Sequence, residues 1–265
     1  MVEPVKDIEE IWAIEDARVE SEKPLVTALE NRGVPLAYDA ASNTFYCTLG
    51  LDHGDQWPDI HLTAPGAKGV ELVFVDDYSF DWCDDAIRDG YPYQVIAYTD
   101  EEFSYFDIVF TGIMQVSIYA DEPFSAEDVP VQAVISDAGE ALSSHARTHY
   151  RGGVTFHGAK KAYRLEFTKN ADGTGKTIAQ VPRFGQVKTL NLIPMMIDKT
   201  FMRDRVTWAL YGLGRPQTER YGTRQTEYVE LYVNDRYEGL YLMMEPYTHE
   251  TELAKKSADA PGTSC

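Results

Sequence analysis

The apolar positions in the first half of the chain fall in short runs, which Gly, Pro and Asp clusters separate. Runs of this length that are rich in β-branched and aromatic residues predict strands. The predicted strands cover 35–39, 43–49, 70–76, 93–99, 105–111 and 113–119. Residues 4–31 are predicted to be partly helical, and residues 84–89 to add a short helix. This pattern predicts an all-β, sandwich-like N-terminal domain.

The second half of the chain begins with strands. Two strand-like segments flank a glycine-containing turn between Arg151 and Lys169, and the run 188–195 is apolar enough to be buried. Later, residues 226–234 and 238–245 alternate apolar and polar positions on either side of a short turn. That alternation predicts a β-hairpin.

A single main helix is predicted between these two pairs of strands. Asp198 is the expected N-cap. Met202, Val206, Ala209 and Leu213 are spaced four, three and four residues apart, which places them in one apolar stripe. The predicted fold class is therefore α+β: a sandwich-like β domain, followed by an antiparallel sheet with one main helix.

The formal net charge of −19 is distributed very unevenly. Residues 1–145 hold 6 Lys and Arg against 30 Asp and Glu, a net of −24, whereas residues 146–245 hold 16 against 10, a net of +6. The second region is therefore suited to face anions, and the first would repel nucleic acid and anionic membranes. The simpler alternative is that the acidic half is only well solvated.

The change in charge predicts a domain boundary near 140–146. Residues 121–130 are predicted to be a polar connection, and 131–136 either a last strand or a bridge into the second region. The predicted parts are an acidic β-rich leader, a basic domain and a polar tail, at 1–140, 146–250 and 251–265.

Cysteine and acidic residues provide no metal-site pattern. No CxxC or HExxH spacing occurs, and an aspartate cluster lacks the spacing of an EF-hand loop. Its members are Asp76, Asp77, Asp81, Asp84, Asp85 and Asp89. A Cys47–Cys83 disulfide is left open by the sequence. No apolar run has the length of a membrane span, and the N-terminal residues lack the apolar core of a signal peptide.

Four short motifs in the second half follow one another in a fixed order. They are Arg151-Gly152, Lys160-Lys161-Ala162-Tyr163-Arg164, Asp198-x-x-x-Met202-Arg203-Asp204, and Asn234-x-x-Tyr237-x-Gly239-x-Tyr241-x-x-x-Glu245. With the order of the elements, these motifs resemble the CotH family of spore-coat atypical protein kinases. The resemblance extends from Arg151 to Glu245 and implies a kinase N-lobe that binds ATP and Mg²⁺.

The resemblance also implies roles for individual residues. Lys160 or Lys161 would contact the triphosphate, because phosphoryl transfer needs a cation there. Strand alternation puts the two lysines on opposite faces, without deciding which one faces the nucleotide. Asp204 would pair with the lysine, and Arg151 would either contact phosphate or brace the domain through a carboxylate.

The end of the second strand pair would begin the kinase hinge. The resemblance implies that Glu245 lies at this hinge, and that Met243 and Met244 line the adenine pocket. The alternative for these methionines is an ordinary packing role. The family's catalytic aspartate and Mg²⁺ ligands lie beyond this point, and only twenty residues follow Glu245. The expected chain is therefore cut off at its hinge, with no assigned catalytic residue and no transferase activity by itself.

Three functions compete on this basis. The first is the nucleotide-binding half of a kinase that phosphorylates Ser or Thr on secreted or spore-coat proteins. The second is a non-enzymatic cell-surface or spore-coat scaffold, and the third is a carbohydrate-binding module that uses Trp57, Trp82 and tyrosines. The resemblance implies a location outside the cell or on the spore surface, and the expected partners include neither nucleic acid nor a membrane.

Overall fold

A computed structural model describes six segments of the chain: 7–49, 60–76, 83–153, 157–196, 198–213 and 225–246. In these segments strands predominate, accompanied by the short helices α1, α2 and α4, so the predicted α+β class broadly fits. The chain divides into two compact units that interleave along the sequence. Unit 1 comprises 1–120, 132–143 and 230–239, and unit 2 comprises 121–131, 144–229 and 240–265. The sequence-based boundary at 140–146 stays a prediction.

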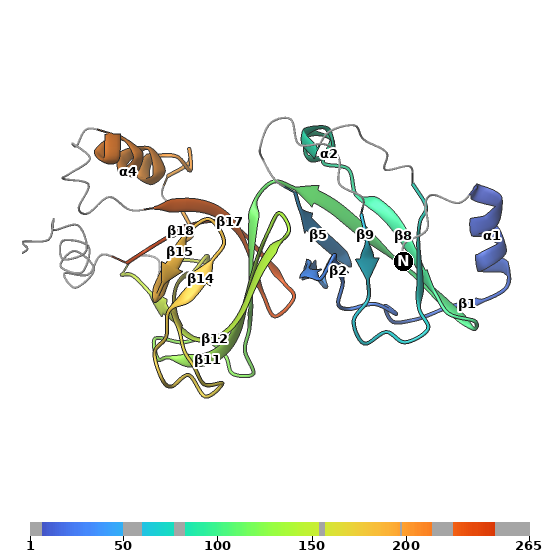
Figure 1. Ribbon diagram of the computed structural model, residues 1–265, viewed down its shortest axis with the longest axis horizontal. Coiled ribbons are helices and arrows are strands. Elements are labelled where there is room, and N and C mark those ends of the chain that lie inside the picture. Colours follow the sequence, from blue (N-terminus) through green and yellow to red (C-terminus); the bar gives the residue numbers. More distant parts are fainter. Residues whose placement is uncertain are drawn as a thin grey trace, which may run out of the picture. The chain divides into compact units, whose positions relative to one another are not determined.

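The main sheet of unit 1 has six strands in the order β4-β5-β9-β8-β7, with β1 paired to β9 (Figure 1). It is a mixed sheet, because β5 and β1 run parallel to β9 while the other pairs are antiparallel. Its strands are β1 Val19–Glu20, β4 Ala37–Asp39, β5 Thr44–Thr48, β7 Glu71–Phe74, β8 Tyr93–Tyr98 and β9 Glu102–Thr111. These strands confirm most of those predicted for the first half.

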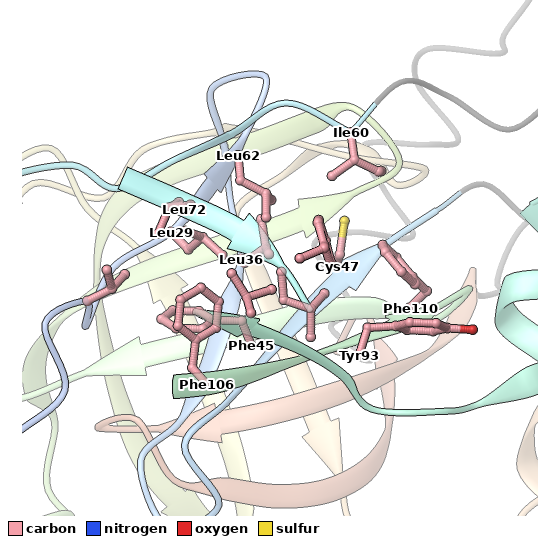
Figure 2. Close-up of a cluster of buried hydrophobic side chains, with 14 of the residues drawn as sticks. Leu29, Leu36, Phe45, Cys47, Ile60, Leu62, Leu72, Tyr93, Phe106 and Phe110 are labelled. Carbon is pink, nitrogen blue, oxygen red and sulfur yellow. The ribbon is translucent and has the colours of Figure 1, made fainter. Parts of the chain in front are cut away.

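A smaller sheet shares a core with the main sheet. Its three strands are β2 Glu30–Asn31, β3 Val34–Pro35 and β6 Leu62–Thr63, in the order β3-β2-β6. Figure 2 shows apolar side chains from both sheets meeting in one cluster, in which Leu29 and Leu62 lie near Phe45 and Phe106. The short helix α2, Cys83–Asp89, adds Cys83 and Ala86 to this core. A core between two sheets agrees with the sandwich-like prediction.

A second apolar cluster lies on the other face of the main sheet. Helix α1, Ile8–Asp16, contributes Ile11 and Ile14, which are buried against Val73, Ile96 and Phe103. Consecutive strand residues point to opposite faces, so Val95 and Ile96 enter different clusters. The main sheet is thus covered on both faces.

The two cysteines of unit 1 are buried as reduced thiols, so the disulfide left open by the sequence is not formed. Burial raises the pKa of Cys47 to about 12, although a hydrogen bond from Asn31 partly opposes this effect. At pH about 8 only about one such thiol in ten thousand is ionised, and the thiolate is the reactive form.

In a Cys265→Ser background, we expect Ellman's reagent to label neither Cys47 nor Cys83 in the native state, and both in urea. Rapid native labelling of Cys47 at this pH would contradict its buried position.

The strands of the second half belong to a closed barrel, in the order β10-β11-β12-β13-β16-β18-β17. They are β10 Met114–Tyr119, β11 Val129–Asp137, β12 Glu140–Arg151, β13 Ala162–Phe167, β16 Thr189–Ile193, β17 Thr226–Val233 and β18 Tyr237–Met244. Residues 131–136 are therefore part of a strand, and the predicted hairpin of 226–245 is confirmed. A closed barrel was not predicted, because closure depends on pairing between strands that are distant in sequence.

Register separates the two faces of the barrel wall within unit 2. Tyr150 pairs with Tyr163, Tyr163 with Leu192, and Leu192 with Met243. Partners in register point to the same side. Of these four, Tyr163, Leu192 and Met243 are buried to at least 97%. This row therefore lines the barrel interior, and the residues that alternate with it lie on the outer face.

Two further elements of unit 2 lie outside the barrel. β14, Ala179–Val181, and β15, Gly185–Val187, form a small hairpin that the sequence pattern did not predict. Helix α4, Arg203–Leu213, confirms the predicted main helix (Figure 1). None of its residues is buried: Met202, just before it, and Val206 and Leu213 are 56%, 42% and 78% exposed. The predicted apolar stripe is present, but the described residues do not bury it.

Candidate functional site

Lys160 and Lys161 lie at the end of the barrel where β12 finishes and β13 begins. The Lys160 Nζ donates a hydrogen bond to the carbonyl oxygen of Leu240 at 2.7 Å, and lies 4.4 Å from the centre of the Tyr241 ring. The Lys161 Nζ lies 5.7 Å from the Tyr150 ring. Contacts of this kind between ammonium groups and aromatic rings are attractive. The two lysines therefore cap an aromatic end of the barrel.

The alternation argument does not apply to these lysines, because β13 begins only at Ala162. Neither lysine is a strand residue, so neither is bound to alternate across the sheet. Their ammonium groups approach Tyr241 and Tyr150, and both rings lie within 6.2 Å of the Tyr163 ring. Both lysines thus face the same aromatic group.

A polar row crosses the outer face of the barrel on four neighbouring strands. His149 pairs with Arg164, Arg164 with Asn191, and Asn191 with Met244. Arg151 lies on the same outer face of β12, two residues beyond His149. Burial, and then the nearby charge of Arg164, lower the pKa of Arg151. Two guanidinium groups are therefore close enough to interact, as in sites that bind anions.

Asn191 is the most deeply buried polar member of this row. Its side chain is 4% exposed, and its Oδ1 has no hydrogen-bond partner among the described residues. Buried polar atoms in proteins normally have a partner. In the sequence, Asn191 stands out only as a polar residue between Leu190 and Leu192.

Carboxylates neutralise the part of the outer face next to the row. Arg147 forms ion pairs with Asp128 at 3.3 Å and with Glu166 at 2.9 Å. Glu166 forms a second ion pair, with Lys176 at 3.0 Å. The His149 Nδ1 lies 2.6 Å from the other oxygen of Asp128. Arg164 has no ion pair with a residue in the part of the chain that the structure describes. Arg164 therefore keeps a positive charge on the row that no described carboxylate neutralises.

Met244 and Glu245 lie where β18 ends. Met244 is 7% exposed and level with Arg164, whereas Met243 is fully buried on the interior face. Glu245 follows the strand and is half-buried. The register thus brings Met244 to the arginine row, while Lys160 lies beside Leu240, four residues earlier on β18.

Asp204 lies in the exposed first turn of α4 and makes no ion pair within the described segments. Its pairing with a lysine stays a prediction. The acidic group that does organise this turn is Asp198, whose Oδ2 accepts a hydrogen bond from the Arg203 amide at 2.7 Å. Burial alone would raise the pKa of Asp198, but hydrogen bonds from Thr200 and Arg203 lower it overall. Asp198 thus accepts from the first turn, as a cap does, although α4 begins only at Arg203.

Some sequence-based candidates fall outside the described residues. They are Trp57 and Trp82 of the carbohydrate-binding hypothesis and Asp77 and Asp81 of the acidic cluster. Among the described residues, no three His, Cys, Asp or Glu side chains gather closely enough to hold a metal ion. None of the described helices has the length and apolar character needed to cross a membrane.

Residues 148–263 match the family model described as CotH kinase protein. No curated protein matches the chain. The matched segment includes β13, β16, α4 and the β17–β18 hairpin, and thus every residue of the polar row. Over this segment, the chain is therefore similar to the CotH kinase family.

Proposed function

We propose that the CotH kinase segment of this chain binds the triphosphate of ATP on the outer face of the barrel. The observation that carries the proposal is the row in which Arg164 lies between His149 and Asn191 and level with Met244. Arg164 and Arg151 supply the positive charge that phosphate binding requires. Met244, at the other end of the row, supplies an apolar and polarisable contact suited to adenine.

The two lysines have a supporting role in this proposal. Lys160 and Lys161 lie at the same barrel end as Arg151, because Arg151 pairs with Ala162. Their ammonium groups add to the local positive potential, which attracts an anionic nucleotide. In the kinase reading, the phosphoryl group is delivered to Ser or Thr of a secreted or spore-coat protein at the cell or spore surface.

The similarity to the CotH kinase family implies use of a divalent metal together with the nucleotide. Magnesium takes carboxylate oxygens, water and substrate phosphates as ligands. The residues that the structure describes do not group carboxylates in this way, so none of them is assigned to Mg²⁺. The role proposed for the described residues is to bind and orient the nucleotide.

Calorimetric titration of the full chain with Mg-ATP tests this function. We expect saturable binding by the wild-type protein, and affinity at least about tenfold weaker in a Lys160→Ala/Lys161→Ala variant, because two positive charges that attract the nucleotide are lost. Lys169→Ala is the matched control: Lys169 is an exposed cation of unit 2 just beyond β13, and should bind as wild type does. Absence of binding by the folded wild-type chain would remove the proposal.

A further inference from the structure

A cluster of tyrosines and carboxylates surrounds the tip of the β17–β18 hairpin inside unit 1. Tyr46 of β5 lies 5.4 Å from Tyr232 and 6.0 Å from Tyr237, measured between ring centres. Tyr232 and Tyr237 are themselves 5.2 Å apart. These three rings close around Glu230 of β17, whose Oε1 lies 3.5 Å from the Tyr237 hydroxyl.

Backbone contacts fasten the same tip to β4 and β10. The Tyr237 amide donates to Asp39 Oδ1 at 3.3 Å, and the Ala40 amide donates to the carbonyl oxygen of Asp235 at 2.7 Å. The Asn234 amide donates to the carbonyl oxygen of Ile118 at 3.0 Å. The hairpin tip is therefore held in unit 1 by hydrogen bonds that amide exchange can follow one by one.

The carboxylate of Glu230 is poorly supplied with hydrogen-bond donors. Its Oε2 is buried and has no partner among the described residues, and the buried hydroxyl of Tyr232 has none either. Asp39 of β4, which is 9% exposed, adds a second carboxylate to the cluster. An ionised carboxylate in such surroundings is costly, whereas a protonated one can donate a hydrogen bond.

We propose that Glu230 and its tyrosine neighbours form a pH-responsive latch, which holds the hairpin tip against β4 and β5 while the carboxyl is protonated and loosens when it ionises. Of the latch residues, Tyr237 begins β18, the strand that ends with Met244. The other titratable and charged groups of the elements packed there are Tyr38, Tyr119, Arg236 and Glu238.

The direction of the pH effect follows from the proton balance. Burial raises the pKa of Glu230 to about 7 from its ordinary value of 4.5, although the contact from the Tyr237 hydroxyl opposes the shift. Between pH 4.5 and about 7, the closed latch holds Glu230 protonated, whereas the open latch leaves it ionised. The equilibrium constant for closing therefore falls as pH rises, by up to about tenfold per pH unit. Above about pH 7 both forms are ionised and Glu230 adds no further change. Asp235, whose pKa burial also raises, acts in the same direction at lower pH.

Hydrogen–deuterium exchange of the full chain between about pH 5 and about pH 8, corrected for the intrinsic exchange rate, tests the latch. Protection of the Ala40, Asn234 and Tyr237 amides is expected to fall by up to about 100-fold in the wild type, and to stay nearly level in Glu230→Gln. Glu238→Gln is the control, because Glu238 lies on the same hairpin but pairs with Arg236, 2.6 Å away, and should behave as wild type.

A second measurement uses the wild-type chain alone, in case Glu230→Gln does not fold. The carboxyl ¹³C resonance of Glu230, followed by NMR, is expected to titrate near pH 7 rather than near the ordinary value for glutamate. Equal pH dependence of protection in wild type and Glu230→Gln would overturn the latch. A Glu230 carboxyl that titrates in the ordinary glutamate range would overturn it as well.

Discussion

Replacing Phe45 with alanine is expected to lower the free energy of unfolding by about 3 to 5 kcal/mol, the range for removing a fully buried phenylalanine. Phe45 has no exposed surface. Its ring stacks on Tyr38 at 4.5 Å and meets the edge of Phe106 at 5.2 Å, so alanine would leave a cavity between the two sheets of unit 1. The loss is measured by urea unfolding followed by circular dichroism.

The control for this prediction is an apolar side chain that is not packed. Val19 of β1 is 71% exposed, and Val19→Ala is expected to change the free energy of unfolding by less than about 0.5 kcal/mol. Similar losses for the two variants would contradict the assignment of Phe45 to the centre of the core.

Replacing Arg164 with alanine is expected to weaken Mg-ATP binding by about 10- to 100-fold, as loss of charge-assisted hydrogen bonds to phosphate predicts. Arg164 is the member of the polar row that lies between His149 and Asn191, and it has no ion pair within the described residues. The fold should tolerate the change, because the Arg164 side chain lies on the outer face. The hydrogen bond that the Thr148 hydroxyl donates to Arg164 uses the backbone carbonyl oxygen, which alanine keeps.

Two further variants separate charge from geometry at this position. Arg164→Lys keeps the charge but loses the planar fork, and is expected to bind with intermediate affinity. Arg147→Ala removes an arginine of the same face that two carboxylates already neutralise, and should have little effect on binding. If Arg147→Ala and Arg164→Ala weaken binding equally, the row does not bind the nucleotide specifically.

The local pattern of apolar and polar residues was sufficient to predict much of the fold. The strands of unit 1 and the β17–β18 hairpin were found because side-chain alternation reports on each strand separately. α4 was found from its apolar spacing. Barrel closure was not predictable, since it depends on register between strands such as β13 and β16, which no local pattern encodes.

The same limit explains what was missed in the candidate site. Arg164 and Asn191 are 27 residues apart in the chain, and only the pairing of β13 with β16 makes them neighbours. The faces of the two lysines were not predictable by alternation, because both residues precede their strand. Glu230 was not singled out, because the tyrosine that approaches it from β5 is distant in the sequence.

The central claim, that nucleotide binds at the outer polar row, is tested most directly by NMR of ¹³C-methyl methionine. Met244 ends the row, whereas Met114 is buried in β10 of unit 1 and is the internal reference. Titration with Mg-ATP is expected to shift the Met244 methyl resonance saturably in the wild type, and much less in Arg164→Ala at the same concentration. The Met114 resonance should not move in either protein. Saturable binding that leaves the Met244 resonance unchanged would contradict the claim.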